Sequence, residues 1–248
     1  RGLDHEHTDG TRLARRLVVA DEFEQRSEAA RNELPDPTRT LTIGEGRPRF
    51  ELYHFGFSIC SQKVRTLLAE KGATYVAHEL EPTENYRPNY VRLRLYAAGD
   101  RSGRVAEAHT MRTSVTTEGF DACVVPTLVD LEARRAIVDS ATILEYLEAE
   151  VPAPPMLPPE IADRVREEIR INDGIPHPGI LYGFHKDDRR PAFWIDAMEG
   201  VYDRKCGVIE RLIDENGDDP ALVRAYRAKI AKEMAGKKIQ KDPTAMAG

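Results

Sequence analysis

The pattern of apolar and polar residues over positions 50–72 predicts a strand, a short loop and a helix. Residues 50–55 are mostly aromatic or aliphatic, which is typical of a buried strand. Beyond a polar loop, apolar residues recur at helical spacing, with Val64 and Leu68 on one face. Gly72 favours the end of that helix. The rest of the chain can be arranged around this unit.

The residues that follow predict further strands and helices, in an order typical of a layered α/β domain. Strands are expected at 73–80, 124–129 and 136–138, and helices after Pro88 and at 141–150. Between them, residues 96–121 show no periodicity and predict a long loop. Pro126 cannot donate a hydrogen bond to a sheet, so we expect it at a strand start or edge. A cis peptide bond is one way to tolerate it.

Shifts in composition divide the chain into three parts. The proline-rich stretch 151–159 is typical of a linker. Helical patterns alone follow it, at 160–173, 191–216 and 219–235. The mostly polar N-terminal part has one expected helix, at 15–24, and we expect it to pack on the main body. The expected division is an N-terminal extension at 1–48, an α/β domain at 49–151 and an all-helical domain at 152–248.

The composition favours a globular protein. Of 248 residues, 41% are hydrophobic and 31% are charged, which excludes a disordered or fibrous chain. No apolar run approaches the ~20 residues that span a bilayer, so we expect no membrane contact. The 36 basic residues are spread evenly in a chain of net charge −6, so we expect no nucleic-acid partner. Because the chain starts at Arg1 rather than Met, we expect a fragment of a longer protein.

Cysteine usage favours a reducing compartment. The three cysteines, Cys60, Cys123 and Cys206, stand far apart, and no C-x-x-C occurs. This pattern argues against a disulfide framework and a structural zinc site, so we expect no metal and a cytoplasmic location. Cys123 precedes an apolar strand and Cys206 lies in a helical pattern, so we expect both to be buried.

Ser58 and Cys60 fall at the start of the first predicted helix. The first turn of a helix has unpaired N–H groups and a partial positive charge, which favour a thiolate over a thiol. The neighbours of Cys60 are polar, which favours a reactive cysteine. The alternative is an inert core cysteine. Asp139 and Ser140 start another predicted helix, where they predict an anion site, simple helix capping, or both.

These pieces, in this order, resemble the glutathione S-transferases. The resemblance rests on S-I-C-S after a strand, V-P-T-L, D-S before a helix, the proline-rich linker and an all-helical second half, and it covers residues 49–248. Within that superfamily, F-S-I-C-S-Q-K-V-R, N-Y-V-R-L-R-L and G-F-D-x-x-V-V-P-T-L-V-D are similar to the chlorohydroquinone reductive dehalogenases. The resemblance implies a thioredoxin-like N-terminal domain and an all-α C-terminal domain, preceded here by an extension.

The resemblance also implies roles for residues around a bound glutathione, the co-substrate of the family. Cys60 matches the redox cysteine, and Ser58 matches the serine that binds the thiolate. The other residues expected to contact glutathione are Gln62, Lys63, Val125, through its backbone beside a cis Pro126, and Asp139 with Ser140 at the γ-glutamyl end. The implied activity is reductive dehalogenation, in which a glutathionyl conjugate forms first and Cys60 then takes glutathione as a mixed disulfide.

A halogenated aromatic substrate is expected between the two halves. The candidates to contact it are Tyr53, His54, Phe57, His177, Tyr182, His185 and Lys186. The alternative for each histidine is a structural role, and the polar stretch around His185 is also typical of a solvated loop. Arg92 and Arg94 are expected to be surface charges that could also contact the long loop or an anion.

Other functions fit the same resemblance. Cysteine-bearing transferases also cleave aryl ethers, remove glutathione from aryl conjugates or reduce disulfides, and some transferase-like domains bind partners without catalysis. Cys60 together with Ser58 and the Asp139–Ser140 pair argues against a non-catalytic module. A homodimer is common among transferases and is expected here only on that ground. A complete transferase has further helices, so the resemblance implies that part of the helical half lies beyond Gly248.

Overall fold

A five-stranded mixed sheet forms the centre of the protein. The computed structural model describes residues 22–99, 119–175, 191–193, 197 and 200–241. The strands are β1 (Thr40–Ile43), β2 (Phe50–His54), β3 (Tyr75–Glu79), β4 (Thr127–Asp130) and β5 (Arg135–Val138). Their order in the sheet is β1-β3-β2-β4-β5, with only the β2–β3 pair parallel.

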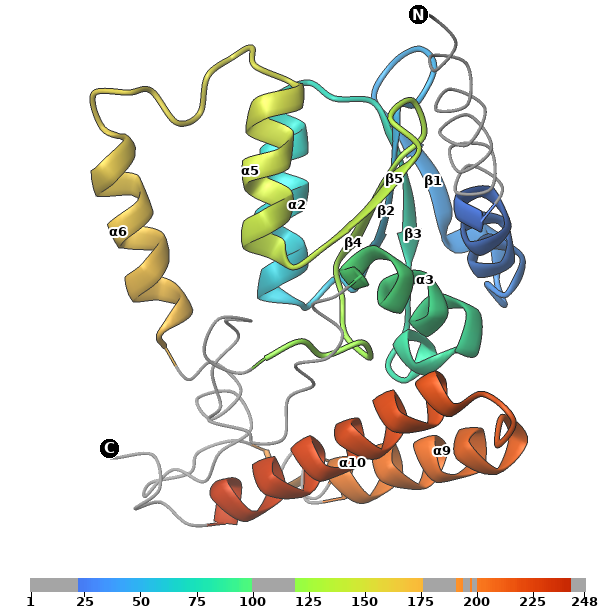
Figure 1. The fold of residues 1–248 in the computed structure, drawn as a ribbon. Helices are drawn as coiled ribbons and strands as arrows, with labels where there is room; N and C mark the ends of the chain where they lie inside the picture. The colour runs from blue at the N-terminus through green and yellow to red at the C-terminus, as the bar shows by residue number, and fades with distance from the viewer. Residues whose placement is uncertain (1–21, 100–118, 176–190, 194–196, 198–199, 242–248) are drawn as a thin grey trace, which may run out of the picture.

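Helices cover both faces of the sheet (Figure 1). Helices α2 (Ile59–Glu70) and α5 (Ser140–Glu150) lie side by side on one face, and α3 (Pro88–Ala98) and a helix over 22–32 lie on the other. Strand β2 is buried along its whole length because both layers cover it. Its Phe50 and Leu52 pack with α2 and α5, whereas Tyr53 packs with Phe23 on the opposite face.

The described residues beyond 151 form helices and no strand. They are α6 (Ala162–Asp173), α9 (Val201–Glu215) and α10 (Pro220–Lys241). Figure 1 shows α9 and α10 as a hairpin packed beside α3, while α6 stands next to α5. A buried cluster joins the hairpin to the sheet part, and Tyr86, Val91, Ile209 and Tyr226 are among its members. The architecture is therefore the expected thioredoxin-like arrangement followed by helices.

Several expected elements differ in extent from the observed ones. The predicted strand at 124–129 starts only at Thr127, because the cis peptide bond at Val125–Pro126, as expected, lies in a loop that precedes it. Helix α10 extends further than the predicted 219–235. Of the helix predicted at 15–24, only the end falls within the described residues, where a helix covers 22–32. The edge strand β1 was missed, because its four residues are mostly exposed.

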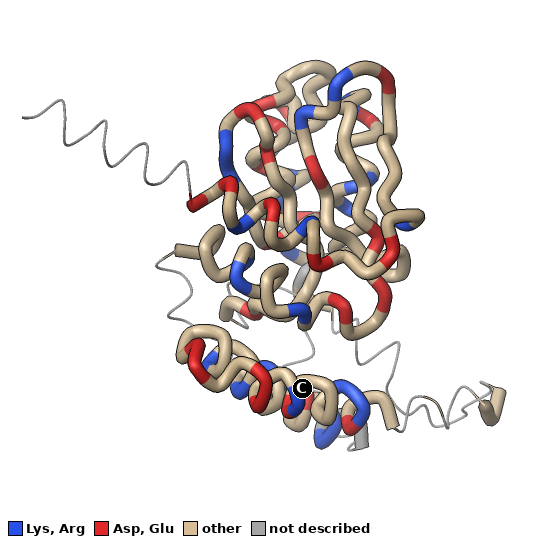
Figure 2. Tube along the Cα trace, turned by 90° about the vertical axis from the view of Figure 1, so that its right-hand side faces the viewer, with Lys and Arg blue, Asp and Glu red and all other residues tan. Residues whose placement is uncertain are grey.

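Charge is mixed along the described chain. Figure 2 shows Lys and Arg interspersed with Asp and Glu over both the sheet part and the α9–α10 hairpin. None of the helices in the described residues is long and apolar enough to cross a bilayer. The same residues contain no group of three or more His, Cys, Asp or Glu arranged to hold a metal ion.

Candidate functional site

The start of α2 presents Ser58 and Cys60 at the end of strand β2. Ser58 is the N-cap, and its Oγ accepts a hydrogen bond of 3.2 Å from the Ser61 N–H. As an acceptor there, the Ser58 hydroxyl keeps its own proton for another partner. Cys60 is the second residue of the helix and is half-buried. In the preceding turn, a Cβ at Gly56 would lie 2.7 Å from Glu79 Oε1, so a larger residue there would displace the end of the Glu79 side chain.

A second helix N-cap, that of Asp139, lies at the start of α5. Asp139 has a φ of +77°, which few residues other than glycine adopt. Its carboxylate accepts hydrogen bonds from the Thr142 N–H at 3.0 Å and the Thr142 hydroxyl at 3.3 Å. The helix-capping interpretation of Asp139 is therefore confirmed. Ser140, the first residue of the helix, is buried.

Sheet register brings these two helix starts and the cis-proline loop to one end of the sheet. Tyr53, near the end of β2, lies opposite Thr127 at the start of β4. Thr127 in turn lies opposite Val138, the last residue of β5. The loop before α2, the loop that contains Val125 and Pro126, and the start of α5 therefore all leave the sheet at the same end. Most of the residues predicted to contact glutathione come from these three segments, whereas Gln62 and Lys63 lie in α2 itself.

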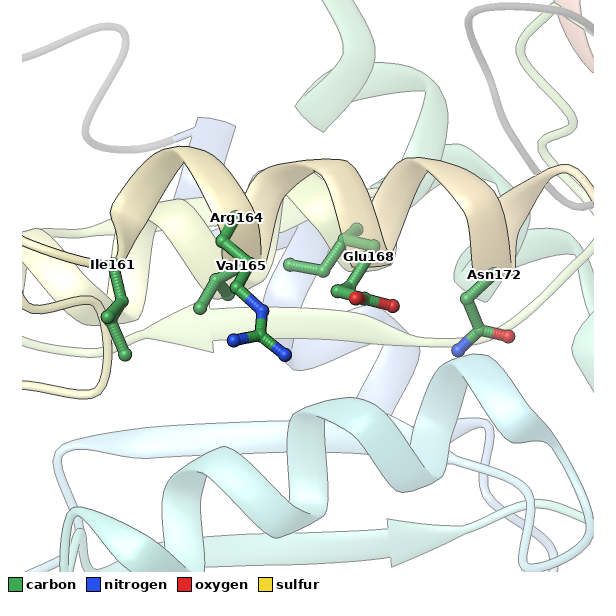
Figure 3. A pocket seen from close by; sticks show the side chains of 6 residues that line it. Ile161, Arg164, Val165, Glu168 and Asn172 are labelled. Atoms are coloured by element: carbon green, nitrogen blue, oxygen red, sulfur yellow. The ribbon is translucent and has the colours of Figure 1, made fainter.

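Gln62 and Lys63 border a groove beside that end. Gln62 Nε2 donates a hydrogen bond of 3.1 Å to the Gly56 carbonyl and ties α2 to the preceding turn. The groove lies between α2, α5 and α6 and is lined by Ile59, Gln62, Lys63, Thr66, Leu144, Ile169 and Asn172. It adjoins a second groove along α6, where Ile161, Val165 and Glu168 lie on one side of that helix (Figure 3).

The residues expected to contact the substrate differ from one another in their exposure. Phe57 is 85% exposed and precedes the Ser58 cap directly, with its ring 5.7 Å from that of Phe55. Tyr53 is fully buried, with its ring 4.6 Å from His78 and 5.5 Å from Tyr90. It lies on the sheet face opposite α2, so we do not retain it as a substrate contact.

His54 is not retained as a substrate contact either. It is only 5% exposed. Burial, with a further contribution from nearby Arg65, lowers the pKa of His54 to about 4, so the imidazole is neutral at pH 7. The other candidates, His177, Tyr182, His185 and Lys186, lie outside the described residues.

Cys60 is the most accessible of the three cysteines. Cys123 is fully buried, and burial together with the Asp121 carboxylate raises the pKa of its thiol well above the usual range. Cys206 is buried on α9, where burial also raises its pKa. The expectation that these two cysteines are buried is confirmed.

The expectation that Arg92 and Arg94 are surface charges is wrong for Arg94. Arg94 is 2% exposed, and its Nη1 donates to the Pro126 carbonyl at 2.7 Å. Arg92 is half-buried and pairs with Asp219 at 2.9 Å, at the start of α10. The alternative that Arg94 contacts the long loop is confirmed, because its Nη2 donates to the Asp121 carbonyl at 3.1 Å. The bonds from Asn85, Tyr90 and Arg94 to the cis-proline loop were missed by the sequence analysis. A tyrosine and an arginine four residues apart on an otherwise apolar helix face would have been the signal.

Comparison with known proteins assigns the α/β part. Residues 57–150 match the family model of the glutathione S-transferase N-terminal domain. The chain therefore contains a domain of the glutathione S-transferase family, as the sequence motifs predicted.

Two curated relatives match a larger part of the chain than the family model does. They are named 2,5-dichlorohydroquinone reductive dechlorinase, come from two strains of Sphingobium indicum, and are 44% identical to this chain over 194 residues. The match covers 76% of this chain but 56% of each relative, so the chain spans little more than half their length.

Solved structures of glutathione transferases are more distant. One is a glutathione S-transferase from Methylobacterium radiotolerans in complex with glutathione sulfonate, and it is 20% identical to this chain. The alignment covers 80% of this chain and 93% of that chain, with a TM-score of 0.36. The β-etherase of a Sphingobium species is 16% identical, with 78% and 68% covered and a TM-score of 0.41. At these values the two structures add nothing to the family assignment.

Proposed function

We propose that this protein carries out glutathione-dependent reductive dehalogenation of a chlorinated hydroquinone. The observation that carries the proposal is the 44% identity over 194 residues to relatives named 2,5-dichlorohydroquinone reductive dechlorinase. A glutathione S-transferase N-terminal domain supports glutathione as the co-substrate.

Glutathione binds at the sheet end where the three loops meet. The Ser58 hydroxyl donates a hydrogen bond to the glutathione thiolate, and the Val125 backbone beside Pro126 pairs with the cysteinyl part. The γ-glutamyl end lies at the start of α5, near Asp139 and Ser140. The shared position of these segments in the sheet supports this arrangement. Gln62 and Lys63, at the adjoining groove, are further contacts.

The reaction has three steps. The glutathione thiolate first displaces chloride from the ketonised tautomer of the hydroquinone, forming a carbon–sulfur bond. The Cys60 thiolate then attacks that sulfur, and the electron pair of the carbon–sulfur bond goes to the ring carbon, which takes up a proton. A second glutathione thiolate finally attacks the mixed disulfide on Cys60 and leaves as oxidised glutathione. In total, two glutathione thiols are oxidised, and one chlorine on the ring is replaced by hydrogen.

The position of Cys60 supports the second step. A thiolate that attacks a conjugate must be accessible, and Cys60 is the one cysteine of the chain that is not buried. The exposed Phe57 offers a ring face for an aromatic substrate on the same turn. Contacts from His177, Tyr182 and His185, and a homodimer, stay predictions.

Turnover of 2,5-dichlorohydroquinone with glutathione tests the proposal. We expect the wild type to release chloride and form chlorohydroquinone. Cys60→Ser should release chloride but accumulate the glutathionyl conjugate, because the second step needs the thiol. Cys206→Ser is the matched control and should behave as wild type, since Cys206 is buried on α9. If the wild type releases no chloride, or Cys60→Ser completes the reaction, the proposal is wrong.

A further inference from the structure

The backbone of the cis-proline loop is held from behind by buried side chains. Asn85 Nδ2 donates to the Cys123 carbonyl at 2.6 Å, and the Tyr90 hydroxyl donates to the Val124 carbonyl at 2.8 Å. Arg94 Nη1 donates to the Pro126 carbonyl at 2.7 Å, and its Nη2 donates to the Asp121 carbonyl at 3.1 Å. Four carbonyls of this short loop therefore have partners on η2 (Glu84–Tyr86) and α3.

Tyr90 and Arg94 also converge on the first residue of β4. The Thr127 hydroxyl lies 3.0 Å from the Tyr90 hydroxyl and 2.7 Å from Arg94 Nη1. Both side chains are 2% exposed, and burial raises the pKa of Tyr90, so its hydroxyl keeps the proton that it donates. Hydrogen bonds from a guanidinium are about twice as strong as neutral ones. The loop is thus fixed to the start of β4 by a buried, cross-linked network.

Val125, next to the cis proline, is not itself bonded by this network. The carbonyls on either side of it, those of Val124 and Pro126, are both held. Within the part of the chain that the structure describes, no hydrogen bond engages the backbone of Val125 itself. An unpaired backbone N–H and C=O favour pairing with an incoming extended peptide. A ligand that pairs there meets a backbone already fixed in place, which lowers the entropic cost of binding.

We infer that Tyr90 and Arg94 are positioning residues that set the affinity for glutathione by holding the Val125 backbone from behind. The inference rests on the proposed function, because it takes glutathione as the ligand of Val125. Both side chains are buried and bond the loop itself, so we expect neither to contact the ligand. Their effect is therefore expected in glutathione binding rather than in the chemical steps.

Removal of a single hydroxyl tests the inference in the full chain. Tyr90→Phe deletes the hydrogen bond to the Val124 carbonyl. Tyr226→Phe is the matched control, because Tyr226 is equally buried but donates to the Tyr86 carbonyl, outside the loop. We expect the glutathione dissociation constant, measured by calorimetry, to rise about 5- to 10-fold in Tyr90→Phe. In Tyr226→Phe it should change less than about 2-fold, despite a similar loss of thermal stability.

Two further measurements separate positioning from general destabilisation. Exchange of the backbone amides of Val124, Val125 and Thr127 should be faster in Tyr90→Phe and unchanged in Tyr226→Phe. Chloride release at saturating glutathione should keep its kcat in Tyr90→Phe, with the effect confined to the KM for glutathione. Arg94→Lys, which keeps a buried cationic donor, should bind glutathione more tightly than Arg94→Met.

The outcomes distinguish this inference from the proposed function. If the wild type does not bind glutathione, both are overturned. If the wild type binds glutathione but Tyr90→Phe binds it equally well, or Tyr226→Phe weakens binding as much, the positioning role alone is overturned. Unchanged amide exchange in Tyr90→Phe would also overturn it.

Discussion

His54 should make the protein lose stability as the pH falls from about 6.5 to about 4. Its side chain is 5% exposed at the end of β2, and its Nδ1 has no hydrogen-bond partner among the described residues. Burial and the Arg65 charge lower the pKa of His54 from 6.5 to about 4. In this range the unfolded chain binds a proton at this histidine and the folded chain does not. The free energy of unfolding therefore falls as the pH falls.

The size of this effect follows from the two pKa values. A tenfold change in an acid dissociation constant corresponds to ~1.36 kcal/mol. Between the ordinary value of 6.5 and the folded value of about 4, His54 alone should remove about 3 kcal/mol. The loss should be absent above about pH 7, where the histidine is neutral in both states. That is a large part of the 5–15 kcal/mol typical of a folded domain.

Urea unfolding of the wild type and His54→Gln between pH 7.5 and about 4.5 measures this contribution. Glutamine is polar and does not titrate, so the acidic residues shared by the two proteins cancel in the difference between their unfolding free energies. We expect the difference to shift in favour of the variant by at least ~2 kcal/mol over this range. A difference that stays constant with pH would refute the argument, because it would mean that His54 is protonated in the fold or lies in contact with water.

Two substitutions test other parts of the fold. Lys229→Met should lower the unfolding free energy, measured by urea unfolding, by about 3 kcal/mol. Lys229 Nζ lies 3.0 Å from Asp121 and 2.9 Å from Glu233, so its loss leaves two buried carboxylates without this partner. A loss below ~1 kcal/mol would show that other lysines already neutralise the two carboxylates. Gly44→Ala should lower the melting temperature more than Gly46→Ala. Both glycines have a positive φ, but a Cβ at Gly44 would lie 2.8 Å from Thr74 Oγ1, whereas a Cβ at Gly46 would meet open space. Equal melting temperatures would contradict the contact.

Local signals were sufficient to predict the strand–loop–helix unit. Ser58 caps α2 through a hydrogen bond three residues along the chain, and the apolar positions of α2 face the sheet. Both effects operate within a few residues, so they are visible in the sequence. Asp139 was predicted at a helix start for the same reason.

The surroundings of Tyr53 and His54 could not be predicted in this way. A strand that is covered on one face alternates between buried and exposed residues, but β2 is covered on both faces and is buried at every position, including Glu51 and His54. Its sequence therefore does not tell which neighbours bury each side chain. The helix over 22–32 supplies one of those layers, and nothing in residues 50–55 indicates it.

Arg94 was misjudged because its environment comes from residues distant in the sequence. Charged side chains on a helix are usually solvated, and a buried guanidinium is tolerated only where enough oxygens surround it. For Arg94 those oxygens belong to residues 121–127, which lie some thirty positions along the chain. The pairing of β4 with β2 and β5, together with the packing of α3 against β5, brings that loop close to Arg94.

The same loop connects the sheet to the helical hairpin. One oxygen of the Asp121 carboxylate accepts a hydrogen bond of 2.8 Å from the Cys123 N–H, and the other accepts one of 3.0 Å from Lys229 Nζ of α10. Lys229 holds the pKa of Asp121 far below its usual range, so the carboxylate stays ionised in spite of its burial. One buried ion pair thus orders the start of the loop and fixes α10 beneath it. Because Arg94 also bonds the Asp121 carbonyl, the hairpin, α3 and the cis-proline loop meet in a single polar network around Asp121.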